Sequence, residues 1–447
     1  MKNAPSWRRG RGDERARPGD AVANCADRVA PLKNFFAKLG PGFISGASDD
    51  DPTAVAAYTQ AGAQFGYTQL WTALFTIPVM TVAAEMSGRI GMVTGKGLIG
   101  VVKTHYSKVT LYGAIALLLA SNVINIGADL GAMAASAQML VGLPFLFWLL
   151  GITALTLVLE VFVPYRAYAT FLKYLALVLL LYVAAAFLER QDWSAIVHAT
   201  FIPTISFDKV FLLNLAAILG TNLSPYLFFW QASEEVEEEV ARHRIGAMGR
   251  GVPELNPRDF RHLRTDTRIG MIFSNAVCFF IAIAAASTLG AHGITDIQTP
   301  QQAALALRPF AGQLSYVLFT VGIIGSGLLA VPVLAGSASY ALSEALGWRE
   351  GLYRKFKCAP GFYGAIVVAT LISVLIDFSS VGPIQMLVYS AAFNALLAPP
   401  LLALILFISN NQEIMGAHTN SPLSNVLGVL TVVGMAASSL ALLVTLI

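Results

Sequence analysis

Long apolar runs recur along the chain from about residue 39 to its last residue, Ile447, and short polar segments separate them. A helix needs about 20 apolar residues to cross a hydrocarbon core about 30 Å thick. The pattern therefore predicts an all-α membrane protein with about eleven transmembrane helices. Their predicted ranges are 40–63, 67–90, 110–140, 143–163, 167–188, 209–231, 269–290, 312–345, 361–378, 382–408 and 423–446.

Prolines and polar residues interrupt two of these spans near the middle. The first span contains the run Asp49 to Pro52, and the sixth contains the run Gly220 to Tyr226. Proline has no backbone donor and disfavours a helical conformation in the residue before it, so both helices are expected to unwind there. The eighth span is expected to be broken as well, at Gly325, Gly327 and Pro332.

The two central breaks are five spans apart. This spacing predicts two inverted repeats, at about 39–188 and 209–408, and an extra helix at about 423–446. Interrupted helices in matching positions of two repeats mark the midplane binding sites of transporters. Asp51 at the first break is therefore predicted to face Ser224 and the carbonyl of Thr221 at the second. Asp50 and Ser48 are predicted to add oxygen ligands beside Asp51.

Charge inside the spans is sparse, which makes the three adjacent aspartates informative. Only 12% of the residues are charged, whereas a soluble protein has about 25%. An ionised side chain at the bilayer centre costs roughly 2.5–3.5 kcal/mol and is usually functional. Hard divalent cations prefer carboxylate and carbonyl oxygens, so the first break predicts a divalent-cation site centred on Asp51. The alternative, a capped helix start outside the membrane, leaves the apolar segments on both sides unexplained.

Lysines and arginines are distributed unequally between the two sides of the predicted bundle. All 29 lie on one side except Arg190, Lys209 and Arg308. By the positive-inside rule, this asymmetry predicts a cytoplasmic N-terminus and an outside C-terminus, in a membrane such as the bacterial inner membrane.

Two polar segments lie outside the predicted spans. Residues 1–38 are basic and are predicted to form a disordered cytoplasmic tail, which precedes a transmembrane domain at 39–447. Anionic lipid head groups suit such a tail better than nucleic acid does. Residues 232–268 carry a run of five glutamates followed by seven arginines. They are predicted to form a solvated cytoplasmic helix with internal ion pairs.

Several short motifs match one known family of membrane proteins. They are Gly40-Pro41-Gly42, Asp51-Pro52, Gln60-Ala61-Gly62-Ala63-Gln64-Phe65-Gly66-Tyr67, Thr94-Gly95-Lys96, Ala128-Asp129-Leu130 and Pro225. Through them the chain resembles the Nramp family of divalent metal transporters. The resemblance implies the LeuT-like fold of the amino-acid/sodium symporters, with the metal bound between unwound helices 1 and 6. It implies a divalent metal as the transported substrate and no resident cofactor.

Departures from the family motifs bear on the choice of ion. The family's Asp-Pro-Gly-Asn motif reads Asp51-Pro52-Thr53-Ala54 here, so the position of the asparagine ligand holds Ala54. The family's Met-Pro-His motif reads Ser224-Pro225-Tyr226, so a hydroxyl replaces a thioether. Oxygen ligands favour Mg²⁺, Mn²⁺ or Ca²⁺ over softer metals, and Mg²⁺ keeps several waters when bound. The chain is therefore most similar to the Nramp-related magnesium transporter branch, and Mg²⁺ or Mn²⁺ is the predicted ion.

The residues that would carry protons in the family are also altered. The third-span aspartate is kept as Asp129, but the acid three residues later is Ala132, and two histidines are replaced by Tyr226 and Gln231. Histidines and paired carboxylates titrate near neutral pH, so facilitated transport is predicted, with a proton-coupled Mn²⁺ or Fe²⁺ symporter as the alternative. The predicted pathway residues are Asp129, Glu85, Tyr226 and Gln231. An i,i+4 ion pair with Arg89 explains Glu85 equally well.

Other classes of function fit the sequence less well. The chain contains no nucleophile elbow, HExxH, phosphate loop or dinucleotide fingerprint, so an enzyme is not predicted. An amino-acid or amine carrier on the same fold is an alternative. Its unwound first helix would receive a carboxylate, which three adjacent aspartates would repel.

Overall fold

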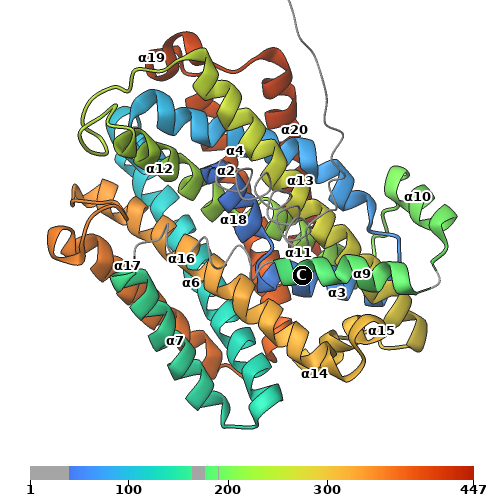
Figure 1. The fold of residues 1–447 in the computed structure, drawn as a ribbon. Helices are drawn as coiled ribbons and strands as arrows, with labels where there is room; N and C mark the ends of the chain where they lie inside the picture. Colours follow the sequence, from blue (N-terminus) through green and yellow to red (C-terminus); the bar gives the residue numbers. More distant parts are fainter. Residues whose placement is uncertain (1–39, 164–176, 190, 447) are drawn as a thin grey trace, which may run out of the picture. The chain divides into compact units, whose positions relative to one another are not determined.

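The computed structural model describes residues 40–163, 177–189 and 191–446, and loops join the helices in these segments. The predicted tail at 1–38 and the first ten residues of the predicted fifth span (167–176) lie outside the described residues. Figure 1 shows the order of the helices along the chain. The longer ones are α2 (Pro41–Asp49), α3 (Pro52–Phe65), α4 (Trp71–Thr94), α5 (Leu98–His105), α6 (Lys108–Val141), α7 (Phe145–Phe162), α9 (Leu181–Leu188), α10 (Trp193–Phe201), α11 (Lys209–Asn222), α12 (Pro225–Ala241), α13 (Pro257–Thr288), α16 (Ser315–Leu346), α17 (Pro360–Ser373), α18 (Pro383–Asn410) and α20 (Pro422–Leu446).

Length and composition allow many of these helices to cross a membrane. Within the described residues, eight helical stretches are long and apolar enough to do so, and they coincide with eight of the predicted spans. The pair α2–α3 and the helix α4 correspond to the first two predicted spans, and α9 corresponds to the end of the fifth. The predicted class, an all-α membrane protein, is confirmed.

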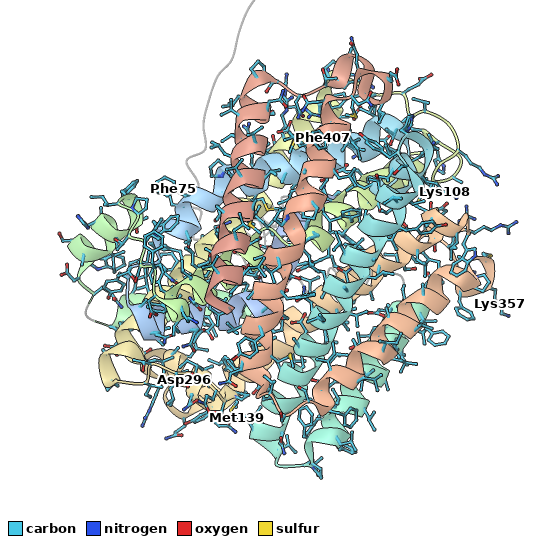
Figure 2. The ribbon with its side chains drawn as sticks, turned by 180° about the vertical axis from the view of Figure 1, so that it is seen from behind. Phe75, Lys108, Met139, Asp296, Lys357 and Phe407 are labelled. Atoms are coloured by element: carbon cyan, nitrogen blue, oxygen red, sulfur yellow. The ribbon has the colours of Figure 1, made fainter. Side chains whose placement is uncertain are left out.

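The outer surface supports the same conclusion. Large apolar side chains are exposed on helices throughout the bundle, among them Phe75, which is 47% exposed, and Phe407, which is 66% exposed (Figure 2). A water-facing surface rarely carries so many apolar side chains. Polar side chains such as Asp51 and Asp129 are instead buried. This inverted distribution is the one that a lipid solvent produces.

Both predicted central breaks are present. The helix α2 ends at Asp49 and α3 begins at Pro52, and Asp51 is the extended N-cap with φ −70° and ψ 172°. The helix α11 ends at Asn222 and α12 begins at Pro225, preceded by Ser224 with φ −63° and ψ 126°. In each case proline takes the first helical position and holds its predecessor in an extended conformation.

The predicted break in the eighth span is wrong. The helix α16 continues from Ser315 to Leu346 and contains Pro332 in its interior. Neighbouring helices make an interior proline tolerable in a membrane bundle. The glycines of α16 serve close packing: a Cβ added at Gly327 would lie 2.4 Å from Met133 Sδ, and one at Gly336 would lie 2.4 Å from Trp230 Cζ3.

Close backbone contacts fix both breaks in place. A Cβ added at Gly46 would lie 2.3 Å from the carbonyl carbon of Gly270, so α2 touches α13 directly. A Cβ added at Gly220 would lie 1.9 Å from the carbonyl oxygen of Ala391, so α11 touches α18. Asp266 of α13 accepts the backbone N–H of Gly42 at 2.8 Å and caps the start of α2. Small residues at such contacts are typical of membrane helices.

The polar segment after the sixth span differs in part from its prediction. The helix α12 continues to Ala241, and three of its glutamates (Glu235, Glu237 and Glu239) are buried, so the predicted solvated helix is wrong there. The predicted internal ion pairs are present, between Arg242 and Glu238 at 3.1 Å and between Arg244 and Glu239 at 3.2 Å. Burial follows because α12 packs against α4 and α16.

Candidate metal-binding site

Asp51 is the buried carboxylate at the centre of the first break, and it is 1% exposed. Its Oδ1 accepts the backbone N–H of Ala54 at 2.8 Å and the hydroxyl of Thr53. Its Oδ2 accepts the hydroxyl of Tyr226 at 3.2 Å. As the N-cap of α3, the carboxylate lies at the positive end of the helix dipole, which stabilises its negative charge.

Two side chains join the first break to the second. The hydroxyls of Thr53 and Thr221 lie 3.1 Å apart, and the Tyr226 hydroxyl lies 3.3 Å from the carbonyl oxygen of Ser48. The structure thus brings Asp51, Thr221 and Tyr226 together, as well as the carbonyl of Ser48. The Ser48 hydroxyl is turned away and donates to the Ile44 carbonyl at 2.8 Å.

Ser224 lies at the second break, and its hydroxyl points back towards the end of α11. Its Oγ lies 2.8 Å from the carbonyl oxygens of both Gly220 and Thr221. Asn394 of α18 donates to Ser224 Oγ at 3.4 Å. The two predicted ligands of the second break, the Ser224 hydroxyl and the Thr221 carbonyl, are therefore hydrogen-bonded to each other. Carbonyl and hydroxyl oxygens each have two lone pairs, so both retain acceptor capacity for a cation.

Asp49 and Asp50 face α13, because α13 packs against the break. Ser274 Oγ lies 2.7 Å from Asp49 Oδ2 and 3.1 Å from Asp50 Oδ1. One hydroxyl has one proton and can donate to only one of these carboxylates at a time. Within the described part of the chain, Asp49 Oδ1 and Asp50 Oδ2 have no hydrogen-bond partner. The predicted ligand Asp50 is thus adjacent to Asp51 but oriented toward Ser274.

Neither Ala54 nor Gln231 places a side-chain oxygen next to Asp51, although both occupy functional positions of the family motifs. Ala54 reaches Asp51 through its backbone N–H and has no side-chain oxygen. Gln231 accepts the Ser45 hydroxyl at 2.5 Å and donates to Glu235 Oε1 at 2.8 Å, so it joins α2 to α12.

The other two predicted pathway acids differ in their surroundings. Glu85 Oε1 accepts Arg264 Nε at 2.9 Å and lies 3.9 Å from Arg89 Nη1, so it belongs to an ion-pair cluster. Asp129 on α6 is fully buried, and neither of its carboxylate oxygens has a hydrogen-bond partner among the described residues.

Several polar residues near the breaks were not predicted from the sequence. Asn222 donates to the Tyr58 hydroxyl at 2.8 Å and to Thr76 Oγ1 at 3.0 Å, and Asn275 of α13 accepts from Thr76 at 2.8 Å. The signal available in the sequence is the spacing of Ser274, Asn275 and Cys278, which places polar atoms on one side of the apolar second half of α13. These residues surround the break with hydrogen-bonding groups.

The structure is a helical membrane bundle with two broken helices, and carboxylates and hydroxyls from the two breaks meet at one buried point. This arrangement is typical of multi-pass membrane transporters. Residues 42–445 match the family model described as natural resistance-associated macrophage protein-like, and the chain belongs to this Nramp family. The predicted family is therefore confirmed.

Individual relatives span nearly the whole chain. The chain is 26% identical over 428 residues to the divalent metal cation transporter MntH of Yersinia enterocolitica, which covers 92% of this chain and 95% of that protein. It is 24% identical over 396 residues to the MntH of Granulibacter bethesdensis, which covers 85% of this chain and 82% of that protein.

Solved structures share the fold. The manganese transporter of Eremococcus coleocola superposes with a TM-score of 0.72 at 16% identity, over 93% of this chain and 87% of that one. Mhp1, a nucleobase-cation-symport-1 family transporter, superposes with a TM-score of 0.51 at 12% identity, over 92% of this chain and 89% of that one. The predicted LeuT-like architecture with unwound helices 1 and 6 is confirmed by this likeness and by the two observed breaks.

Proposed function

We propose that this chain carries a divalent metal cation across a membrane and holds it between the two helix breaks. One observation carries the proposal: Asp51, a buried N-cap carboxylate, is joined to the second break through Thr53 and Tyr226. The names of the relatives as divalent metal cation transporters support the same substrate class.

The ligands in this proposal are all oxygens. Asp51 supplies the charge. The carbonyl of Ser48 is linked to it through Tyr226, and the hydroxyl of Thr221 is linked to it through Thr53. Ser224 and the Thr221 carbonyl complete the set at the second break. Asp50 joins this set if its carboxylate turns from Ser274. Such a hard site favours Mg²⁺ or Mn²⁺ over softer metals, and water fills the remaining positions around Mg²⁺.

The driving force in this proposal is the membrane potential. A potential of 100 mV is worth about 2.3 kcal/mol per elementary charge, so a divalent cation gains about 4.6 kcal/mol by entering a negative interior. Such a gain needs no proton relay, in agreement with alanine at position 132 and glutamine at position 231. The proposal places the N-terminus in the cytoplasm and the C-terminus outside, in a membrane such as the bacterial inner membrane.

Uptake into proteoliposomes tests the function. We expect the purified protein to take up Mg²⁺ or Mn²⁺, with Ca²⁺ and Fe²⁺ as weaker competitors, and we expect Asp51→Ala to abolish uptake. The matched control is Asp296→Ala, because Asp296 is an exposed carboxylate in the loop before α14 (Pro300–Ala304) (Figure 2). Unimpaired uptake by Asp51→Ala would contradict the proposed site.

A proton-coupled symporter is the second candidate, and Asp129 is the observation that favours it. A buried carboxylate without a hydrogen-bond partner is costly as an ion and is suited to carry a proton. Liposomes loaded with a pH-sensitive dye decide between the two mechanisms. Acidification that requires the metal, and is lost in Asp129→Asn, would establish coupling; an unchanged internal pH during metal uptake supports facilitated transport.

A further inference from the structure

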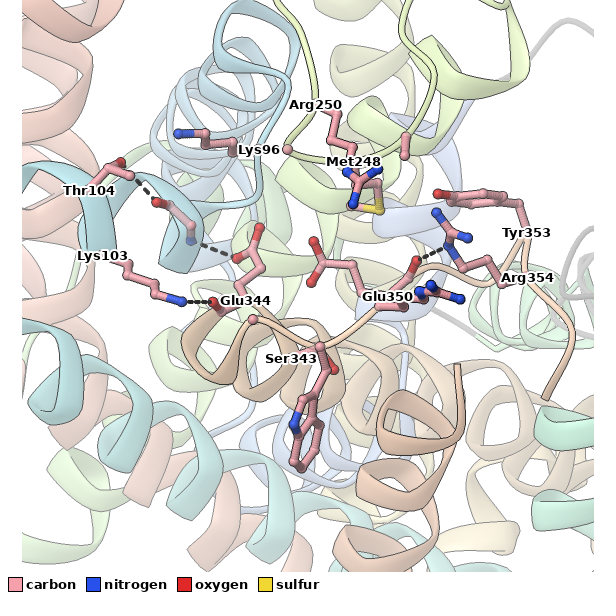
Figure 3. A pocket seen from close by; sticks show the side chains of 16 residues that line it. Lys96, Lys103, Thr104, Met248, Arg250, Ser343, Glu344, Glu350, Tyr353 and Arg354 are labelled. Carbon is pink, nitrogen blue, oxygen red and sulfur yellow. Dashed lines mark hydrogen bonds between the residues drawn. The ribbon is translucent and has the colours of Figure 1, made fainter. Parts of the chain in front are cut away.

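Two cavities of different chemistry adjoin at Trp348. The first, which we call the basic pocket, has a volume of about 450 Å³ and lies between α5, the end of α16 and the loops that follow α12 and α16 (Figure 3). The second, which we call the apolar groove, has a volume of about 510 Å³ and lies between α6, α16 and α17. Trp348 lines both and is 43% exposed.

The basic pocket carries an excess of cationic side chains. Its basic lining residues are Lys96, Lys103, Arg250, Arg349 and Arg354, and its acidic ones are Glu344 and Glu350. Arginine and lysine in such a cluster bind phosphate oxygens through charge-assisted hydrogen bonds. The charge of this pocket is therefore complementary to a phosphate group.

The two glutamates are accounted for without a ligand cation. Glu344 Oε2 accepts the backbone N–H of Gly100 at 2.8 Å and so caps α5. Burial raises the pKa of Glu350 to about 9, and repulsion from Glu344 and Glu237 adds to this effect. A raised carboxyl pKa means that Glu350 is protonated below pH 9 and does not repel an anion at neutral pH.

The apolar groove has the length of one lipid chain within one leaflet. It follows α17 from Gly361 to Ile372, a rise of about 16 Å at 1.5 Å per residue, and half of a typical hydrocarbon core is about 15 Å. Leu119, Leu342 and Val368 line it with apolar atoms. Gly361 is the second residue of α17, and a Cβ added there would lie 2.7 Å from Trp348 Cδ2. The groove therefore begins at the end of α17 that adjoins Trp348, which also lines the basic pocket. Tryptophan is common at this depth, between head groups and acyl chains.

We propose that the basic pocket and the apolar groove together bind one anionic phospholipid, with its phosphate among the arginines and lysines and one acyl chain along α17. The charge of the basic pocket suits the phosphate of a lipid, and the length of the apolar groove matches one acyl chain. Trp348 lines both, so a phospholipid can occupy both at once, whereas a free phosphate would leave the groove empty. The site lies in the leaflet predicted to face the cytoplasm. It does not depend on the metal-transport proposal, because none of its lining residues belongs to the helix breaks.

Lipid titration of the full-length protein in detergent tests the site. We expect phosphatidylglycerol to bind at least tenfold more tightly than phosphatidylcholine with the same acyl chains, by native mass spectrometry and by the rise in melting temperature. Arg349→Gln combined with Arg354→Gln is expected to remove that preference. The matched charge control is Arg308→Gln, because Arg308 is an exposed arginine remote in sequence from this pocket.

Filling the groove gives an independent test. A Cβ added at Gly364 meets nothing within 4 Å, so Gly364→Leu is expected to fold and to block the acyl chain. It should weaken phosphatidylglycerol binding at least tenfold while leaving the melting temperature in phosphatidylcholine unchanged. Gly151→Leu on α7 is the control, because a Cβ there also meets nothing within 4 Å. Equal binding of both lipids, unchanged binding in Gly364→Leu, or full competition by inorganic phosphate would each overturn the proposal.

Discussion

The two helix breaks share a backbone design but differ in charge. Each break places proline at the first position of the second half-helix and an extended residue before it. At the first break that residue is Asp51, which caps α3 through its side chain. At the second break it is Ser224, whose hydroxyl turns back to α11. At both breaks proline starts the second half-helix, and the residue before it sets the chemistry of the opening.

This difference assigns unequal roles to the two repeats. The first break supplies carboxylates, which attract a cation at long range in a medium of low dielectric constant. The second break supplies neutral oxygens, which orient the bound ion without adding charge. Removing a residue from the first break should therefore affect binding of any cation, and changing the second should affect the choice among cations.

The largest expected effect comes from removing the charge of Asp51 while keeping its cap. Asparagine is as good an N-cap as aspartate, so Asp51→Asn should fold and retain the bond to the backbone of Ala54. We expect metal uptake to fall by about 100-fold, which corresponds to about 2.7 kcal/mol. The measurement is initial uptake of Mn²⁺ or Mg²⁺ into proteoliposomes. Retention of more than half of the wild-type rate would mean that the carboxylate charge is not the anchor of the site.

The hydroxyl of Tyr226 links the two breaks, and Tyr226→Phe removes it alone. Asp51 Oδ2 then loses a donor at 3.2 Å, which should destabilise the metal-free protein by about 1–3 kcal/mol, as for other buried polar groups left unpaired. A bound cation compensates the same oxygen, so the metal-dependent rise in melting temperature should be larger in Tyr226→Phe than in the wild type. Thermal unfolding with and without Mn²⁺ measures this difference.

The control for Tyr226→Phe is another buried tyrosine. Within the described residues, the hydroxyl of Tyr182 has no hydrogen-bond partner. Tyr182→Phe should therefore leave the metal-dependent shift at its wild-type value. An equal shift in all three proteins would indicate that Tyr226 does not act on the ion site.

The sequence was sufficient for the breaks because their signals are local. A proline directly after a polar residue in an apolar span is a local signal, and Asp51-Pro52 and Ser224-Pro225 open where predicted. Pro332 follows the apolar Val331, and α16 continues through it. The orientation of Asp49 and Asp50 was not predictable, because it depends on the contact of Gly46 with Gly270 that brings Ser274 to them. The link between Thr53 and Thr221 depends in the same way on packing between residues far apart in the chain.

A smaller effect is expected from changing the ligand chemistry of the second break. Ser224→Met replaces a hydroxyl by a thioether, which softer metals tolerate and Mg²⁺ does not. We expect the ratio of Mn²⁺ to Mg²⁺ uptake to rise by about tenfold, or about 1.4 kcal/mol, in a competition assay. Ser224→Ala removes the oxygen without adding sulfur and serves as the control. A ratio that rises equally in both variants would attribute the change to the lost hydroxyl alone.

The smallest expected effect belongs to Pro332, which shows that proline alone does not open a helix in this bundle. The helix α16 already passes through Pro332, so an alanine at this position keeps the same backbone and regains an intrahelical donor. Pro332→Ala should therefore change uptake by no more than about twofold, or about 0.4 kcal/mol. Pro225→Ala is the paired variant, because it allows helix to propagate from α11 into α12 and should reduce uptake strongly. Equal losses in the two variants would mean that Pro332 takes part in transport, and that the two central breaks are not the only places where proline shapes the ion pathway.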